Sequence, residues 1–224
     1  MSLAYEMDEK RPRAFGLVVL QTDETVEADL HRLLPDGSRL FVTRVPSGAE
    51  VTREALAAME GEITHACSLL PRPVVFECVG YACTSGTSVI GAKRVAELVA
   101  AGCRAARVTE PVSALVARCR RDGVRRLGLV SPYVEDVSAG LRHVLESRGI
   151  DVPHFASFDV AEEAKVARID RRSVENAARD MAARDVDAVF LSCTNLRTLN
   201  VIEGWRGPVP LLSSNSVLAD ALFA

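Results

Sequence analysis

Two cysteines of this chain stand in matching surroundings, each after a short apolar run and each followed by threonine. Cys83 follows Val79-Gly80-Tyr81-Ala82, and Cys193 follows Val189-Phe190-Leu191-Ser192. A thiolate is both a base and a nucleophile, and a helix N-terminus lowers a thiol pKa below its ordinary value of about 8.5. Two thiols on opposite sides of a substrate could remove one proton and supply another, which inverts a stereocentre without PLP or a metal.

Small hydrogen-bonding side chains follow both cysteines. Thr84 and Ser85 come after the first cysteine, and Thr194 and Asn195 come after the second. Such donors suit a substrate carboxylate and the enolate-like charge that forms when an α-proton leaves. Because an α-proton is far less acidic than a thiol, these donors must supply much of the catalysis.

The other four cysteines have a simpler interpretation, because a free cysteine is most often a small buried hydrophobe. Cys67 and Cys119 lie in helical patterns, Cys78 lies in a predicted strand, and Cys103 follows the end of a predicted helix. We therefore expect these four thiols to have no role in catalysis.

The elements that position the two cysteines alternate along the chain. Short β-branched runs predict strands at 14–20, 40–45, 74–79, 126–130, 154–158, 188–191 and 209–212. Between them, apolar residues at helical spacing predict helices at 52–70, 88–101, 112–121, 138–148 and 173–184. This alternation predicts an α/β protein with parallel sheets flanked by helices. Both cysteines then lie at the carboxyl ends of strands, where such sheets bind ligands.

The pattern also repeats at an offset of about 111 residues. Gly16-Leu17-Val18-Val19 is matched by Gly128-Leu129-Val130, and from these glycines it is 67 positions to Cys83 and 65 to Cys193. We therefore predict a duplicated lobe, with residues 14–110 plus 208–224 in the first lobe and 111–207 in the second. The active site is expected between the lobes, and Pro111 suits the first turn of the second lobe's first helix.

Composition excludes several functions. The 224 residues are 48% hydrophobic and 25% charged, with 27 basic and 30 acidic residues and a net charge of −3. No basic stripe favours nucleic acid, no apolar run could span a membrane, and no G-x-G-x-x-G or zinc-ligand spacing is present. Met1 to Arg13 is polar and unlike a signal peptide, and Met1-Ser2-Leu3 could be a cloning remnant. We expect a cytoplasmic protein with reduced thiols, no cofactor or metal, and a small-molecule partner; a homo-oligomer is left open.

Four ordered motifs resemble a known group of enzymes. They are residues 16–27 (GLVVLQTDETVE), the Cys83 motif, Ser131-Pro132-Tyr133 and the Cys193 motif. They resemble the aspartate/glutamate racemase superfamily, closest to the branch of maleate cis-trans isomerase, arylmalonate decarboxylase and the racemase-like protein of ectoine-utilisation operons. The resemblance implies two flavodoxin-like lobes related by a pseudo-twofold axis, with a substrate between them and no cofactor.

The resemblance also implies roles for individual residues. Cys83 and Cys193 would be the thiol pair, Thr84 and Ser85 would bind a carboxylate or enolate, and Tyr133 would be another donor. Asp23 occupies the polar position after the first strand. Asn195 stands where amino-acid racemases have histidine, and Asp23 stands where maleate isomerases have asparagine. These two departures favour the ectoine-type protein over aspartate racemisation and maleate isomerisation.

Four possibilities remain from the sequence. The leading hypothesis is an isomerase that racemises a small amino or dicarboxylic acid with both thiols. A cis-trans isomerase could instead use Cys83 as a nucleophile that forms a thioether. Decarboxylation is less favoured, because arylmalonate decarboxylase resembles this pattern with only the second thiol. A non-catalytic carboxylate-binding protein would keep the same fold.

Overall fold

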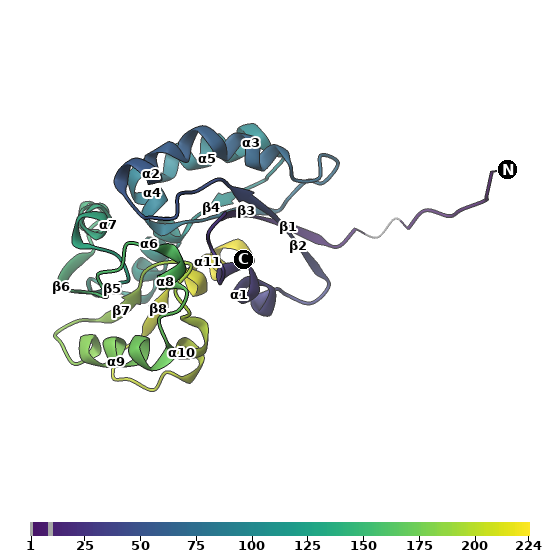
Figure 1. The fold of residues 1–224 in the computed structure, drawn as a ribbon. Helices are drawn as coiled ribbons and strands as arrows, with labels where there is room; N and C mark the ends of the chain where they lie inside the picture. Colours follow the sequence, from purple (N-terminus) through teal and green to yellow (C-terminus); the bar gives the residue numbers. More distant parts are fainter. Residues whose placement is uncertain (1, 9–10) are drawn as a thin grey trace.

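The computed structural model describes residues 2–8 and 11–224, which form two four-stranded parallel sheets (Figure 1). The first sheet has the order β2-β1-β3-β4 and the second has the order β6-β5-β7-β8. The strands are β1 Arg13–Leu20, β2 Ser38–Val45, β3 Cys78–Ala82, β4 Val108–Thr109, β5 Arg126–Ser131, β6 Asp151–Ser157, β7 Ala188–Leu191 and β8 Leu211–Ser213. The predicted α/β class with two similar lobes is confirmed.

The repeat is visible in the strand order. Within each sheet the first strand in sequence pairs on one side with the second and on the other with the third, and the fourth lies at the edge. Cys83 follows β3 and Cys193 follows β7, the equivalent strand of the other sheet. The two cysteines therefore lie at equivalent positions of the two sheets, as the sequence repeat predicted.

Helices cover both sheets. In Figure 1, α2 to α5 lie above the first sheet, while α9 and α10 lie below the second. The helices are α1 Val26–Leu33, α2 Arg53–Ala58, α3 Glu60–Ser68, α4 Thr84–Ile90, α5 Ala92–Gly102, α6 Pro111–Asp122, α7 Glu135–Ser147, α8 Glu163–Val166, α9 Arg171–Ala182, α10 Leu199–Gly204 and α11 Ser214–Leu222. Pro111 begins α6, as predicted, and the Glu110 carboxylate caps it by accepting from the Val112 and Ser113 amides.

Three predicted boundaries were wrong. The helix predicted at 52–70 is divided at Met59, and the helix predicted at 88–101 is divided at Gly91, whose φ of 93° no regular helix allows. The strand predicted at 74–79 begins only at Cys78, because Pro71 and Pro73 start a turn in which the Val74 amide donates to the Pro71 carbonyl.

The C-terminal segment corrects the predicted lobes. Its strand β8 pairs with β7 in the second sheet, so the assignment of 208–224 to the first lobe was wrong for the strand. The physical reason is the repeat itself, since the second sheet needs an equivalent of β4. The helix that follows does cross over: Leu218 and Leu222 of α11 pack against Phe15 and Leu17 of β1.

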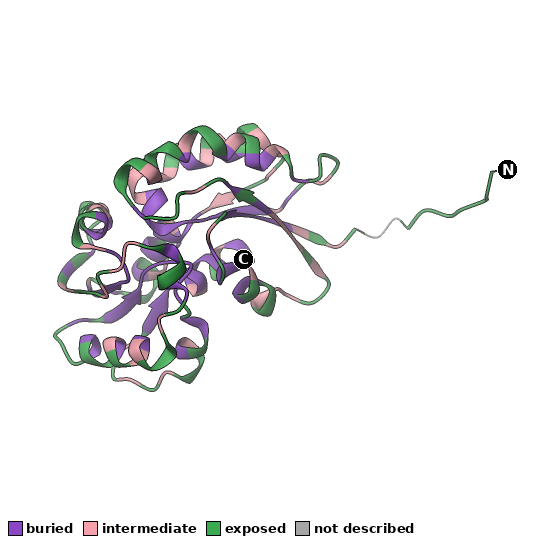
Figure 2. Ribbon diagram, viewed as in Figure 1, coloured by how far each residue is buried: buried purple, intermediate pink, exposed green. Residues whose placement is uncertain are grey.

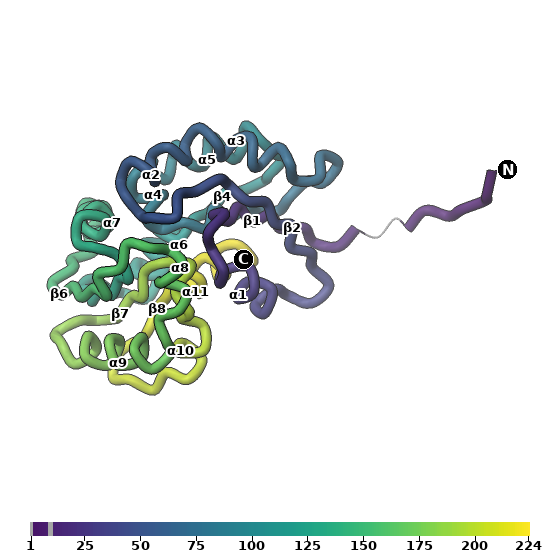
Figure 3. The backbone as a smooth tube through the Cα atoms, in the orientation of Figure 1, coloured from purple at the N-terminus to yellow at the C-terminus, as the bar shows by residue number. Residues whose placement is uncertain are grey.

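The helix after β4 crosses in the opposite direction. Leu115 and Cys119 of α6 pack with Leu127 and Leu129 of β5 in the second sheet. The two lobes therefore exchange their last helices, and the C-terminus lies beside α1 of the first lobe (Figure 3). Buried residues run continuously through the centre of the molecule (Figure 2). In the described part of the chain, no helix is long and apolar enough to cross a membrane.

Two helical glycines give a stability test of this packing. A Cβ at Gly102 would press on the Thr64 carbonyl oxygen and lie 2.5 Å from Cys67 Cβ, whereas a Cβ at Gly140 would meet nothing within 4 Å. Gly102→Ala should therefore lower the free energy of unfolding by roughly 1–3 kcal/mol. Gly140→Ala should raise it by about 0.5–1 kcal/mol, because alanine favours the helix. Denaturant unfolding measures both, and equal effects of the two substitutions would contradict the close contact between α3 and α5.

Candidate active site

Cys83 occupies the junction between β3 and α4. All five residues of β3 are buried, and Cys83 caps α4 by accepting the Gly86 amide hydrogen on Sγ at 3.1 Å. Gly86 is required here, because a Cβ would lie 2.9 Å from Cys83 Sγ and 2.8 Å from the Tyr81 hydroxyl oxygen. The strand end and the following glycine therefore fix the first thiol, with an amide hydrogen directed at its sulfur.

Cys193 occupies the equivalent end of β7 with a strained backbone. Its φ is 100°, in the left-handed region that a residue with a side chain rarely adopts. Such a conformation costs about 1–3 kcal/mol and persists only where the surroundings hold it. Here the Cys193 amide donates to Ser214 Oγ at 3.0 Å, and Sγ accepts the Asn195 amide hydrogen at 3.3 Å.

Hydroxyl groups join the two cysteine segments across the lobes. Thr194 Oγ1 donates to the carbonyl oxygen of Ala82, which precedes Cys83, at 3.1 Å. Thr84 Oγ1 lies 2.8 Å from Ser214 Oγ, which also holds the Cys193 amide. Both threonine hydroxyls, which were predicted to bind substrate, are thus engaged in holding the thiols in place.

A hydrogen-bonded line runs from Cys193 to a buried carboxyl group. Tyr133 Oη lies 2.9 Å from Cys193 Sγ and donates to Glu163 Oε1 at 2.6 Å. Because the single Tyr133 hydrogen goes to Glu163, the thiol hydrogen of Cys193 is the one directed at Tyr133 Oη. Asn195 Nδ2 donates to Glu163 Oε2 at 2.7 Å, while Asn195 Oδ1 accepts the Glu24 amide hydrogen at 2.8 Å.

Asp23 lies in the loop between β1 and α1. Its Oδ1 accepts the amide hydrogens of Thr25 and Val26, both at 2.8 Å, and the residue is only 5% exposed. Burial raises the carboxyl pKa and outweighs these two hydrogen bonds. Burial likewise raises the pKa of Glu163, against the opposing effect of its bonds from Tyr133 and Asn195.

The thiols do not have the lowered pKa that the sequence predicted. Burial raises the pKa of Cys83 to about 12, and the pKa of Cys193 lies well above the ordinary value for the same reason. The carboxylates of Glu163 and Asp23 raise both thiol pKa values further. The helix expected to lower the Cys83 pKa spans only Thr84–Ile90, and the Gly86 amide offsets only part of the cost of desolvation.

All eight residues predicted for the site line one cavity: Asp23, Cys83, Thr84, Ser85, Tyr133, Cys193, Thr194 and Asn195. The sequence missed three further lining residues, Leu20, Leu56 and Glu163, and also missed Ser214 behind the thiols. Glu163 gave no signal because it lies in a short charged segment, whereas Ser213-Ser214-Asn215 after β8 could have been recognised as another polar strand end.

The cavity is closed. The space among these side chains is about 10 Å³, which is room for about one water molecule. Over it, the Val51 amide donates to the Ala161 carbonyl oxygen at 2.9 Å, and the Glu163 amide donates to the Ala49 carbonyl oxygen at 3.0 Å. We call the paired segments 46–52 and 159–162 the strap. A carboxylate substrate is larger than this space, so the residues around the cavity must move before it can bind.

Buried Glu163 should make stability depend on pH. Because its pKa is raised above 4.5 on folding, the folded protein binds the proton more tightly, and stability falls as the pH rises from about 4.5 to the folded pKa. Glu163→Gln should remove this contribution to the fall in the free energy of unfolding. The contribution is about 1.4 kcal/mol for each pH unit by which folding raises the Glu163 pKa. Urea unfolding between pH 4 and 8 measures it. Glu146→Gln, on the exposed side of α7, is the control and should leave the slope unchanged.

The closed cavity also predicts slow alkylation of Cys83 and Cys193. At pH 7 without ligand, Cys83 and Cys193 should react with iodoacetamide at least about tenfold more slowly than a free thiol, because little thiolate is present. Cys103 is the internal control: it is less buried, and its hydrogen bond with Cys67 lowers its pKa. Peptide mass spectrometry should find Cys103 modified first; earlier modification of Cys83 would contradict the closed site.

Comparison with known proteins agrees with this geometry. The family model described as arylmalonate decarboxylase matches residues 15–218. The maleate isomerase of Nocardia farcinica is 30% identical over 191 residues, which cover 81% of this chain and 76% of that protein. The arylmalonate decarboxylase of Bordetella bronchiseptica is 29% identical over 217 residues, covering 93% and 88%.

Solved structures show the same fold. A Cys-to-Ser mutant of the Nocardia farcinica maleate cis-trans isomerase, with a covalently bound succinylcysteine intermediate, superposes with a TM-score of 0.81 at 26% identity, covering 93% of this chain and 90% of that one. A maleate isomerase from Pseudomonas putida, in complex with maleate, gives 0.81 at 21% identity and the same coverage. The resemblance inferred from four motifs is confirmed, and so is the expectation of an enzyme. This chain belongs to the arylmalonate decarboxylase family.

Proposed function

We propose that this protein is a cofactor-independent isomerase of a small carboxylate, in which Cys83 and Cys193 react with the substrate from opposite sides. The observation that carries the proposal is the pair of thiols: Cys83 and Cys193 follow equivalent strands of the two sheets and line one cavity. Isomerisation is also the activity named for three of the curated relatives. These relatives favour the maleate-isomerase type of reaction over the ectoine type that the sequence favoured.

Cys193 is suited to proton transfer. Its thiol is hydrogen-bonded to Tyr133, whose hydroxyl is hydrogen-bonded to Glu163. When Cys193 loses its proton, the Tyr133 hydroxyl can turn to donate its hydrogen to the negatively charged sulfur. Replacing Tyr133 would leave the thiol in place but isolate it from the carboxyl group. We therefore assign Cys193 as the acid and base of the reaction.

Cys83 is suited to nucleophilic attack. Its sulfur accepts the Gly86 amide hydrogen, a contact that stabilises negative charge on the thiolate. When the strap separates, water reaches the sulfur, the cost of desolvation falls, and the thiol can give its proton to solvent. The thiolate is then enclosed with the substrate when the strap closes.

The reaction follows in two balanced halves. Cys83 thiolate adds to one carbon of a cis double bond, forming a C–S bond, while the π electron pair moves to the neighbouring carbon and takes the proton of Cys193. Rotation about the resulting single bond exchanges the substituents. Cys193 thiolate then removes a proton, the C–S bond breaks, and the trans alkene leaves with the Cys83 thiolate restored. The succinylcysteine of the Nocardia relative is a saturated adduct of this kind.

Racemisation is the second candidate, and Asp23 is the observation that favours it. An α-amino acid carries an ammonium group, which a buried carboxylate can bind. In this reaction one thiol removes the α-proton and the other returns a proton from the opposite face. Substrate α-hydrogen would then exchange with solvent deuterium, and no C–S adduct would form.

Trapping experiments test the assignment of the thiols. Wild type, Cys83→Ala and Cys193→Ser should be incubated in deuterated water with cis-unsaturated acids and with single enantiomers of amino acids, followed by ¹H NMR and intact-protein mass spectrometry. Each substitution should lower the turnover by roughly 10²–10⁴-fold. Cys193→Ser should accumulate protein carrying the mass of one substrate on Cys83, because the proton needed for release is no longer removed efficiently.

Cys119→Ala is the matched control, because Cys119 is buried in α6 away from the cavity, and it should keep nearly full turnover. An adduct on Cys193 would overturn the division of roles. Deuterium exchange at the α-carbon without any adduct would establish the racemase instead, and turnover that survives both cysteine substitutions would refute the two-thiol mechanism.

A further inference from the structure

The active-site cavity is acidic. Its lining residues include Asp23 from the first lobe and Glu163 from the second, and no lysine, arginine or histidine lines it among the described residues. Burial raises the pKa of both carboxyl groups, and the like charge of Asp23 raises the pKa of Glu163 further. A substrate with two carboxylates would bring two more negative charges into this space.

Asp23 presents an acceptor without a partner. Its Oδ1 binds the Thr25 and Val26 amides, but Oδ2 is buried and has no hydrogen-bond partner among the described residues. The Thr194 hydroxyl lies close enough to Asp23 to lower its pKa, but it donates its hydrogen to the Ala82 carbonyl oxygen. A buried acceptor in this state is costly unless a ligand supplies a donor.

The Glu163 carboxyl group is positioned by two hydrogen bonds. Both of its carboxyl oxygens accept hydrogen bonds, from Tyr133 and from Asn195. The two carboxyl groups therefore line the cavity from opposite lobes.

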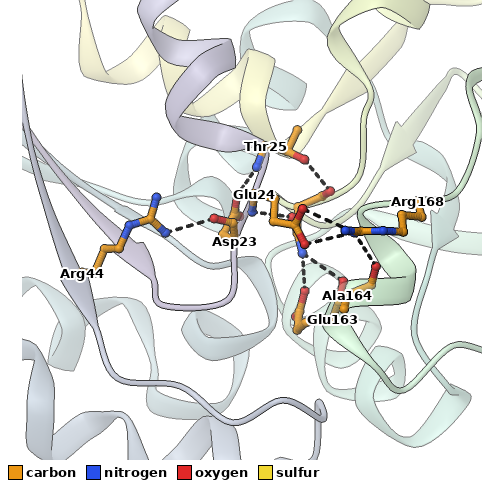
Figure 4. Close-up of polar contacts among 8 residues, drawn as sticks. Asp23, Glu24, Thr25, Arg44, Glu163, Ala164 and Arg168 are labelled. Atoms are coloured by element: carbon orange, nitrogen blue, oxygen red, sulfur yellow. Dashed lines mark hydrogen bonds and ion pairs between the residues drawn. The ribbon is translucent and has the colours of Figure 1, made fainter.

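The nearest cations are engaged outside the cavity. Figure 4 shows Arg44 donating to the backbone carbonyl oxygen of Asp23, and Arg168 paired with Glu24 and donating to the Ala164 carbonyl oxygen. Arg44 also pairs with Glu27. Both arginine side chains are partly exposed. Neither guanidinium is directed at the second oxygen of Asp23.

We infer that the substrate carries one carboxylate and, in place of a second, an N–H donor that Asp23 Oδ2 accepts. The donor is an amide or an ammonium group. It supplies the hydrogen that Asp23 lacks, whereas a second carboxylate would place acceptor against acceptor. The substrate carboxylate would then bind on the other side of the cavity, near the buried hydroxyl of Ser85. This inference rests on the proposed function, because it describes the substrate of the same site.

Three saturated ligands of similar shape test the inference by binding alone. Succinate has two carboxylates, succinamate has an amide in place of one, and β-alanine has an ammonium group. Isothermal titration at pH 7.5 should show that succinamate or β-alanine binds wild type at least tenfold more tightly than succinate. Comparing the two N–H compounds decides between amide and ammonium.

Asp23→Asn gives the converse experiment. Asparagine can keep Oδ1 on the Thr25 and Val26 amides while placing an NH₂ group where Oδ2 stands. The preference should then invert, with succinate gaining at least tenfold in affinity relative to succinamate. Glu146→Gln removes one exposed negative charge from α7 and should leave the preference unchanged. A gain in affinity is not expected from a substitution that merely damages the fold.

Turnover separates this inference from the proposed function. With maleate and its monoamide maleamate, wild type should convert maleamate with at least a tenfold higher kcat/KM, and Asp23→Asn should favour maleate. If wild type binds and converts the diacids at least as well as the amides, the inference is overturned while the isomerase stands. If the binding preference is found but no unsaturated or chiral acid is converted, the inference stands and the isomerase fails. Equal affinity for all three saturated ligands in both proteins also overturns the inference.

Discussion

The hydroxyl of Ser214 bonds the backbone amide of Cys193 and also contacts the hydroxyl of Thr84. Together with the bond from Thr194 to the Ala82 carbonyl oxygen, it holds the end of β3 against the end of β7. The Thr194 bond links the two thiol segments directly, and Ser214 links them through its contacts with Cys193 and Thr84. The distance and orientation of the two sulfurs therefore depend on how the lobes meet, and the strained φ of Cys193 is kept by the same contacts.

The contact between the two strand ends also determines the pKa values of the titratable groups in the site. Two carboxyl groups, two thiols and a tyrosine are enclosed together, and burial raises the pKa of every one of them. The closed site therefore keeps both thiols protonated and holds no ready thiolate. In the proposed reaction, reactivity alternates with opening: water lowers the cost of charge on the thiols when the strap separates, and enclosure then strengthens each electrostatic contact with the substrate.

The exchange of helices explains how two separate sheets can hold so small a cavity. α6 follows the first sheet but packs on the second, and α11 follows the second sheet but packs on the first. Each lobe is therefore completed by a helix of the other. The hydrophobic core continues from one sheet to the other, so the two lobes share one core and are not independent bodies.

The sequence by itself determined the local features: alternating strands and helices, the repeat, and the positions of Cys83 and Cys193 at equivalent strand ends. These follow from periodicity and from residue types that act over a few positions. Only the tertiary structure decided which sheet β8 joins, how α6 and α11 cross, and that Glu163 and Ser214 lie beside the thiols. It also reversed the expected thiol pKa, because desolvation depends on everything that surrounds a sulfur, and residues 30 to 130 positions apart supply those surroundings.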